Sequence, residues 1–198
     1  MGNMNMYLFD LLNAGSGLSG WPLYFAIAAA EYLIYVIPIG LVVGWLWSSS
    51  QYRSTILAAT LVGFLALGIN QLINLAWFHP RPFMMHVGDT YLVHAPDSSF
   101  PSDHVTLLWA IGLVFMTRPY TRLPGAVVLL FAMLAAWARA YLGVHFPLDM
   151  AGAVLVATLS VVATRSLQWL PDRYLLPRLE RLYRATFARA IEHRWVHG

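Results

Sequence analysis

The chain has 198 residues, of which 59% are hydrophobic and only 11% charged, and its mean hydropathy is +0.61. Soluble domains carry about 25% charged residues, so this composition excludes an ordinary soluble domain and favours a polytopic membrane protein. Cysteine is absent, which excludes a disulfide framework and a thiolate metal site. We therefore expect a single all-helical integral membrane domain over residues 1–198, with no nucleic-acid partner.

Apolar runs alternate with short polar loops along the chain. Residues 3–14 have helical spacing of apolar side chains but are too short to cross a bilayer, which predicts a helix at the membrane interface. The N-terminus lacks a basic region, so no cleavable signal is expected. Five spanning helices of an all-α bundle are predicted at residues 21–47, 54–77, 105–117, 124–143 and 145–170, of which the third is short.

Polar residues inside the first two predicted spans need partners, because a polar group in hydrocarbon is costly. Glu31 lies deep in the first span, and we interpret it as bonding to neighbouring helices, with a headgroup path as the alternative. Asn70 and Asn74 share one face of the second span. Asn74 is predicted either to hydrogen-bond between helices or to bind a headgroup.

A polar segment, Ala-Pro-Asp-Ser-Ser-Phe-Pro-Ser-Asp-His at residues 95–104, separates the second and third predicted spans. Ser102 predicts a helix N-cap, with Asp103 and His104 in the first turn. A helix that begins there presents unpaired backbone N–H groups and the positive end of its dipole to a ligand. This arrangement favours an anion, above all a phosphate.

Arginine supplies all 12 basic side chains, and its distribution predicts the topology. If the spans alternate, the loops after the first and third spans share a side with the tail at residues 171–198, and the positive-inside rule makes this side cytoplasmic. Arginines alternate with leucine and aromatic residues in the tail, which predicts a basic amphipathic helix on an anionic leaflet or a solvated tail. Only Arg81 and Arg139 then lie on the outer side, near His104 and His145.

Three outer segments together carry the groups that phosphoryl transfer requires. Arg81 and Arg139 can clamp phosphate oxygens and stabilise the charge of the transition state, and Ser102 adds a neutral donor. Two prolines bracket Arg81 and restrict the backbone that holds it.

The two histidines supply the reacting groups. One imidazole can attack phosphorus while the other protonates the leaving oxygen, and Asp149 can hold the tautomer of His145. A metal site of Asp103, His104, His145 and Asp149 is the rival interpretation, which the two arginines oppose because an anion clamp repels a cation. His79, His86 and His94 are expected to have structural roles, and Asp97 a turn role.

The ordered pattern of Arg81-Pro82, then Pro101-Ser102-Asp103-His104, then Arg139 with His145 and Asp149 resembles the three signature motifs of the type 2 phosphatidic acid phosphatase superfamily. The resemblance implies that His145 is the nucleophile that becomes a phosphohistidine, with Asp149 as its partner. It also implies that His104 is the general acid and that no metal or other cofactor is needed. The implied phosphate-binding residues are Arg81, Ser102 and Arg139.

Three positions depart from the family pattern, which usually has lysine where this chain has Asn74, serine at Ala138 and glycine at Asp103. Asn74 and Asp103 are kept as candidate phosphate-binding residues. The amino-acid sequence around the first two motifs is similar to that of the bacterial undecaprenyl diphosphatases associated with bacitracin resistance.

The resemblance therefore implies hydrolysis of undecaprenyl diphosphate to the monophosphate at the outer face of a bacterial inner membrane, with the polyprenyl chain remaining in lipid. Hydrolysis of phosphatidic acid, phosphatidylglycerophosphate or lipid A is the alternative within the same chemistry. A lipid-phosphate binder or flippase without turnover is the alternative from another class. Assembly into a homo-oligomer is left open by the sequence.

Overall fold

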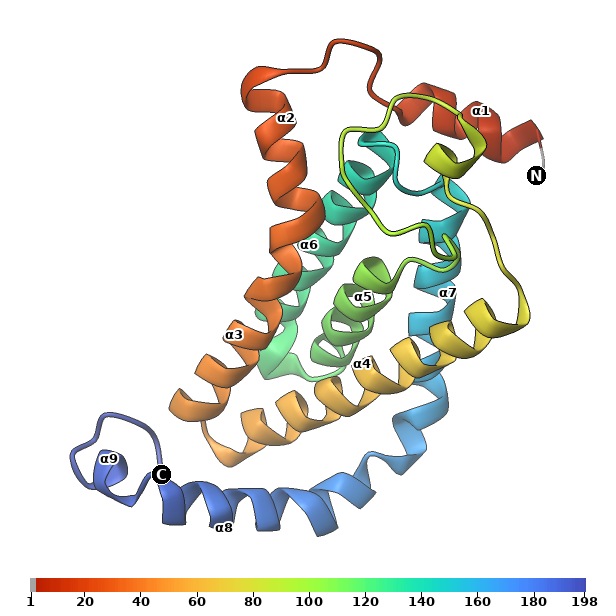
Figure 1. The fold of residues 1–198 in the computed structure, drawn as a ribbon. Coiled ribbons are helices and arrows are strands. Elements are labelled where there is room, and N and C mark those ends of the chain that lie inside the picture. Colours follow the sequence, from red (N-terminus) through yellow and green to blue (C-terminus); the bar gives the residue numbers. More distant parts are fainter. Residues whose placement is uncertain (1–2) are drawn as a thin grey trace.

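The protein is described by a computed structural model over residues 3–198, which contain helices and no strand (Figure 1). The all-α prediction is confirmed. The α-helices of the described residues are α1 (Asn3–Leu12), α2 (Gly20–Ile27), α3 (Leu33–Trp47), α4 (Ser50–Ala76), α5 (Asp103–Met116), α6 (Arg122–Tyr141), α7 (Pro147–Thr164), α8 (Leu176–Thr186) and α9 (Ala188–Glu192). A π-helical turn, η1 (Ala28–Tyr32), joins α2 to α3, and short 3-10 or π-helical segments are η2 (Pro82–Met85), η3 (Pro119–Thr121), η4 (Arg165–Leu167) and η5 (Pro171–Leu175).

Within residues 3–198, four helical stretches are long and apolar enough to cross a membrane: Gly20–Trp47, Ser50–Ala76, Pro119–Tyr141 and Pro147–Leu167. The third predicted span is present as α5, but its 14 residues make it shorter than the others. At a rise of about 1.5 Å per residue, α5 is about 21 Å long, less than the ~30 Å of a hydrocarbon core. The structure thus has four long apolar helices and one short one, in agreement with the prediction that the third of the five spans is short.

The short helix α5 forms the centre of the bundle and packs against α4, α6 and α7 (Figure 1). Its apolar side chains, including Leu108 and Val114, are buried in the main core cluster together with small residues of α4 and α6. At Gly112, an added Cβ would lie 2.8 Å from the side chain of Leu129, so α5 and α6 approach closely. Because α5 is surrounded by protein, its N-terminal turn can carry polar groups at a depth where other helices face lipid.

The outer surface of the bundle is apolar, as expected for helices in lipid. Phe64, Leu130 and Leu155 project from different helices and are 67%, 57% and 58% exposed. Their exposure would be unfavourable in water and is favourable in hydrocarbon. The protein is therefore an integral membrane protein.

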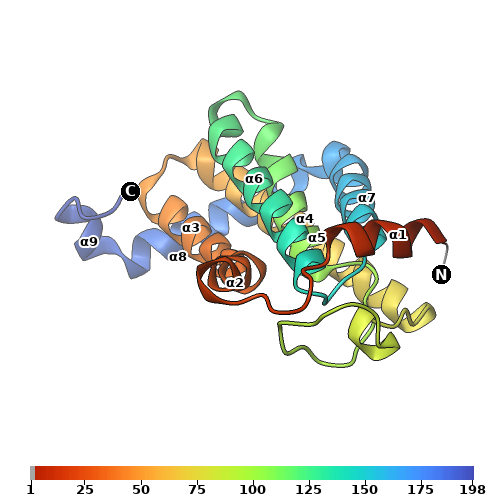
Figure 2. The same cartoon turned by 90° about the horizontal axis from the view of Figure 1, so that it is seen from above.

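One end of the bundle is covered by the loop between α4 and α5, and α1 crosses this end (Figures 1 and 2). The Asn13 amide joins the pieces: its Nδ2 donates to Asp89 O at 2.9 Å and to Tyr141 O at 3.1 Å, while its Oδ1 accepts from Asp89 N–H at 2.8 Å. The predicted N-terminal helix is confirmed, and its place at the membrane interface stays a prediction.

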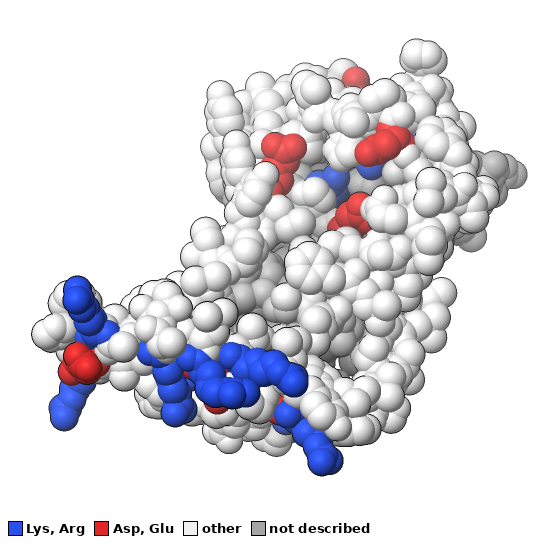
Figure 3. Space-filling view, turned by 60° about the horizontal axis from the view of Figure 1, so that its bottom comes forward, with Lys and Arg blue, Asp and Glu red and all other residues white. Residues whose placement is uncertain are grey.

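The C-terminal tail lies at the opposite end of the bundle, where α8 returns beneath α4 (Figure 1). Its anchor is Arg53, which is only 1% exposed. The Arg53 guanidinium lies 4.4 Å from the ring centroid of Tyr183 on α8, and its Nε donates to Trp45 O at 2.9 Å. The exposed arginines of the tail gather along this end of the molecule (Figure 3). The tail is thus a helix docked on the bundle, and its contact with a leaflet stays a prediction.

Candidate active site

A polar cavity of about 450 Å³ lies where the end of α4, the loop that follows it, the start of α5 and the α6–α7 turn meet. All three segments singled out in the sequence contribute to its wall. The polar lining residues are Gln71, Asn74, Arg81, His94, Asp97, Ser98, Asp103, His104, Arg139 and His145.

His145 is held at the turn between α6 and α7. The turn requires Gly143, whose φ is +78° and whose added Cβ would lie 2.2 Å from Asp89 O. One helical turn later, Asp149 accepts the Phe146 N–H at 2.8 Å through Oδ2, and the same oxygen lies 3.3 Å from His145 Nδ1. The spacing of four residues therefore gives the predicted imidazole–carboxylate pair.

Both arginines of the predicted clamp point at the other nitrogen of the same ring. Arg81 Nη1 lies 2.9 Å from His145 Nε2, and Arg139 Nη2 lies 3.4 Å from it. A guanidinium can only donate, so Nε2 carries a lone pair and the proton resides on Nδ1, facing Asp149. This is the tautomer that a nucleophilic imidazole needs.

Electrostatics favours the same state. Burial lowers the pKa of His145 well below its ordinary range, and the neighbouring Arg139 and Arg81 guanidiniums lower it further. His145 is therefore neutral near pH 7, with its lone pair available.

Each guanidinium is also fixed from behind. Arg81 is 4% exposed; its Nε donates to Asp97 Oδ1 at 2.7 Å and its Nη1 to Val144 O at 2.9 Å. Arg139 is 2% exposed, and its Nη1 donates to Ala30 O at 3.0 Å. Ala30 belongs to the π-helical turn η1, so this irregularity in the first span supplies a carbonyl to the clamp.

The start of α5 contributes the second histidine. His104 lies in the first turn of α5 and lines the cavity, as Asp103 does. The Asp103 carboxylate accepts from Asn70 Nδ2 at 2.8 Å and from Gln71 Nε2 at 3.1 Å, so its side chain is directed to α4. A role of Asp103 in phosphate binding stays a prediction. The backbone N–H of Asp103 is better suited to bind a phosphate than its carboxylate.

Ser102 occupies the predicted N-cap position of α5, but its side chain makes no capping hydrogen bond within the described part of the chain. The residue is fully buried, and its backbone N–H donates to Asp149 O at 3.4 Å. The Ser102 hydroxyl is not among the groups that line the cavity, so its contact with phosphate stays a prediction. Asn74 does line the cavity, and its Oδ1 is buried without a hydrogen-bond partner among residues 3–198.

The structure adds site residues that the sequence analysis missed. The Ser99 hydroxyl donates to Asp149 Oδ2 and lies 3.3 Å from His145 Nδ1. His94, assigned a structural role above, lines the cavity with its Nε2 3.1 Å from Arg139 Nη2. His79 Nδ1 lies 3.8 Å from Asp149 Oδ1. Their only signal was their position: Ser99 lies in the polar segment at residues 95–104, His94 directly precedes that segment, and His79 lies just before Arg81.

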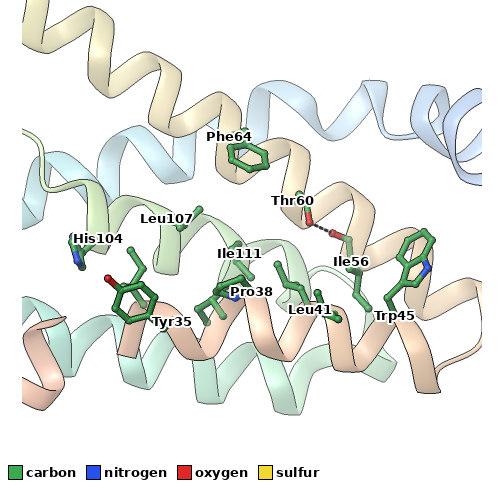
Figure 4. Close-up of a pocket in the computed structure, with 13 residues that line it drawn as sticks. Tyr35, Pro38, Leu41, Trp45, Ile56, Thr60, Phe64, His104, Leu107 and Ile111 are labelled. Carbon is green, nitrogen blue, oxygen red and sulfur yellow. Dashed lines mark hydrogen bonds between the residues drawn. The ribbon is translucent and has the colours of Figure 1, made fainter. Parts of the chain in front are cut away.

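A second, apolar cavity of about 620 Å³ runs between α3, α4 and α5 (Figure 4). His104 lies at one end and Trp45 at the other, with Tyr35, Leu41 and Phe64 among the side chains between them. His104 lines both cavities, so the apolar groove and the polar site adjoin at this side chain. Residues 3–198 contain no group of three or more His, Cys, Asp or Glu side chains that could hold a metal ion.

The family model of the PAP2 superfamily matches residues 52–173, which include every predicted site residue. The chain belongs to the PAP2 superfamily. This result confirms the resemblance deduced from the three motifs.

Two relatives of this PAP2 chain are named for one lipid diphosphate. YbjG of Escherichia coli (strain K12), provisionally named an undecaprenyl-diphosphatase, is 35% identical over 195 residues, which are 98% of each chain. The undecaprenyl-diphosphatase BcrC of Bacillus subtilis (strain 168) is 39% identical over 127 residues, which are 64% of this chain and 65% of BcrC.

Solved structures share the fold at lower identity. LpxE of Aquifex aeolicus has a TM-score of 0.58 at 24% identity, covering 83% of this chain and 96% of LpxE. A PAP2-type phosphatidylglycerolphosphate phosphatase of Bacillus subtilis has a TM-score of 0.58 at 18% identity, covering 86% and 87%. The helical arrangement of this PAP2 membrane phosphatase is thus that of its superfamily.

Proposed function

We propose that the protein hydrolyses undecaprenyl diphosphate to undecaprenyl phosphate and inorganic phosphate, through a phosphohistidine on His145. The observation that carries this proposal is the convergence of two guanidiniums on His145 Nε2, at 2.9 and 3.4 Å. When a phosphate binds, its oxygens can accept the hydrogen bonds that Arg81 and Arg139 otherwise direct at His145 Nε2. The phosphorus atom then lies in front of the Nε2 lone pair. The binding energy of the phosphate is thereby used to align His145 Nε2 for attack on phosphorus.

In the first half-reaction, His145 Nε2 forms a bond to the terminal phosphorus while the bridging P–O bond breaks. The two arginines stabilise the charge on the equatorial oxygens, and Asp149 stabilises the imidazolium that forms. His104 gives a proton to the bridging oxygen, so the lipid leaves as the monophosphate. The negative charge of the bound substrate favours the protonated form of His104 before this step.

In the second half-reaction, water attacks the phosphohistidine and gives its proton to His104. The P–N bond breaks, inorganic phosphate leaves and His145 returns to its neutral form. The two steps use the chain's own acid, base and nucleophile and return each of them to its starting state.

The lipid substrate is supported by the apolar groove and by the names of the two relatives. We assign the groove to the first isoprene units, because a linear apolar chain fits a channel that ends at His104. This differs from the sequence-based expectation that the whole chain remains in lipid. Phosphatidic acid, phosphatidylglycerophosphate and lipid A are the competing substrates, since their phosphates would bind the same clamp.

We place the protein in a bacterial inner membrane, with the site on the outer face and the basic tail at residues 171–198 in the cytoplasm. Residues 1–198 then form one phosphatase domain. The released undecaprenyl phosphate serves again as the lipid carrier of cell-wall synthesis. The position of the exposed arginines at the end opposite the site supports this orientation (Figure 3).

The test is phosphate release from undecaprenyl diphosphate by purified protein in detergent with a chelator present. His145→Ala and Arg81→Ala should each lower kcat/KM by about 10³-fold or more, because they remove the nucleophile and a transition-state donor. Phosphatidic acid, phosphatidylglycerophosphate and lipid A, assayed in parallel, rank the substrates. Full activity of His145→Ala would contradict the mechanism, and a wild type inactive on all four lipids would favour a binder or flippase.

A further inference from the structure

The loop before α5 contains two side chains that accept hydrogen bonds from the two guanidiniums, and His94 contacts the same Nη2 of Arg139 that faces His145. His94 Nε2 lies 3.1 Å from Arg139 Nη2, and Asp97 Oδ1 accepts from Arg81 Nε at 2.7 Å. The two supports are neighbours, since His94 Nδ1 lies 3.7 Å from the same Asp97 oxygen. One short loop segment thus connects arginines that come from different elements.

The hydrogen bonds define the state of His94. Its Nδ1 lies 3.1 Å from Ala95 O, a group that can only accept, so the proton is on Nδ1. Its Nε2 then has a lone pair that accepts from Arg139. A protonated His94 could not make this contact.

A neutral acceptor for Arg139 Nη2 has a specific advantage. A buried carboxylate there would orient the guanidinium but would also cancel its charge and repel the phosphate. An imidazole fixes the direction of the N–H groups and leaves the positive charge for the substrate. Asp97 can serve Arg81 despite its charge because its side chain is 59% exposed and therefore solvated.

We propose that His94 and Asp97 are positioning residues of the phosphate clamp, which aim Arg139 and Arg81 at the phosphoryl group bound in front of His145. The inference rests on the proposed function for its lipid substrate, but the phosphate affinity of the clamp does not depend on which lipid is hydrolysed. Neither residue belongs to the three motifs that carry the family resemblance.

The charged and titratable groups around His94 predict a pH signature. Arg81 and Asp97 from its own loop, Arg139 from α6, His104 from α5 and His145 from the α6–α7 turn face it. Burial lowers the pKa of His94, and Arg81 lowers it further. The accepting form therefore persists below the ordinary value of 6.5 and is lost as the pH falls through the lowered pKa.

The first test compares two replacements of His94. His94→Gln can place its amide oxygen where Nε2 lies, so it should keep kcat/KM and the affinity for inorganic phosphate within about threefold of the wild type. His94→Leu has no acceptor and should lower both about tenfold or more, the cost of one hydrogen bond to a charged group. His94→Gln should also lose less activity than the wild type as the pH falls through the lowered pKa of His94, because it cannot be protonated.

The matched control is His86→Asn, which removes a histidine of the same loop outside the cavity and suits the left-handed backbone there, where φ is 55°. Phosphate affinity is measured by calorimetry on the protein in detergent, independently of turnover. If the wild type binds phosphate but hydrolyses no lipid, the proposed function fails while the positioning role is still tested by the affinities. Equal phosphate affinity of His94→Leu and wild type, or equal impairment of His94→Gln and His94→Leu, overturns the inference.

Asp97 provides the second test. Asp97→Asn retains an acceptor for Arg81 Nε and should keep most of the phosphate affinity, whereas Asp97→Ala should lower it about tenfold. If Asp97→Ala binds phosphate as the wild type does, Asp97 has no part in positioning Arg81.

Discussion

At the scale of single residues, the site is a chain of groups that each fix the next. Ser99 donates to Asp149 Oδ2, Asp149 holds the Nδ1 side of His145, and Nε2 faces the arginines. The pair of His145 and Asp149 could be predicted from a separation of four residues at a helix start, and the structure forms it with His145 just before the N-cap Phe146 and Asp149 in the first turn of α7. Ser99 could not, because it is 50 residues from Asp149 in sequence and a serine in a polar loop has no distinguishing pattern.

The Ser99 contact predicts a change in turnover. Ser99→Ala should lower kcat about tenfold with little change in KM, because Asp149 and the His145 tautomer lose a partner that acts on the nucleophile rather than on the lipid. Ser160→Ala is the matched control, since the Ser160 hydroxyl donates within its own helix to Val156 O at 2.8 Å. Steady-state kinetics on the lipid diphosphate measure both; a change confined to KM would contradict the assignment.

At the scale of elements, the sequence predicts the helices better than the loop over the site. The length of the apolar run and the predicted N-cap at Ser102 give the first residue of α5 correctly, since the helix begins at Asp103. The loop at residues 77–102 lacks periodicity, and its course depends on contacts within the loop, such as Ser99 N–H to His79 O at 2.7 Å, and on contacts with distant segments, such as Tyr91 N–H to Leu142 O at 3.0 Å. For this reason His94 and Asp97 could be seen in the sequence but not placed.

One helix contact sets the position of the α5 start. Gly152 of α7 faces the ring of Phe100, and a Cβ added there would lie 2.2 Å from it. Gly152→Ala should therefore displace Phe100 together with Pro101 and Ser102, destabilise the fold by about 1–3 kcal/mol and lower kcat/KM. Thermal unfolding in detergent and phosphate release measure the two effects.

The control for Gly152 is another helical glycine. Gly40→Ala on α3 adds a Cβ that meets no atom of residues 3–198 within 4 Å, so it should unfold at or slightly above the wild-type temperature. A Gly152→Ala protein with wild-type stability and activity would show that Phe100 can move without consequence for the site.

At the scale of the whole molecule, the polar site and the arginine-rich tail occupy opposite ends of the bundle (Figures 1 and 3). The positive-inside rule then predicts that the site opens away from the cytoplasm. The absence of cysteine from the sequence allows single cysteines to report each end. Val93→Cys lies in the loop over the site at a position that is 97% exposed, and Arg181→Cys lies on the exposed surface of α8.

In intact cells, a membrane-impermeant maleimide should label Val93→Cys and leave Arg181→Cys unlabelled until the membrane is permeabilised. The reason is electrostatic: moving the tail arginines across the membrane would take their charge through a low dielectric and onto the side that the arginine bias disfavours. Labelling of both variants after permeabilisation shows that each cysteine is reactive. The reverse pattern in intact cells would place the clamp in the cytoplasm, where it would act on lipid phosphates of the inner leaflet.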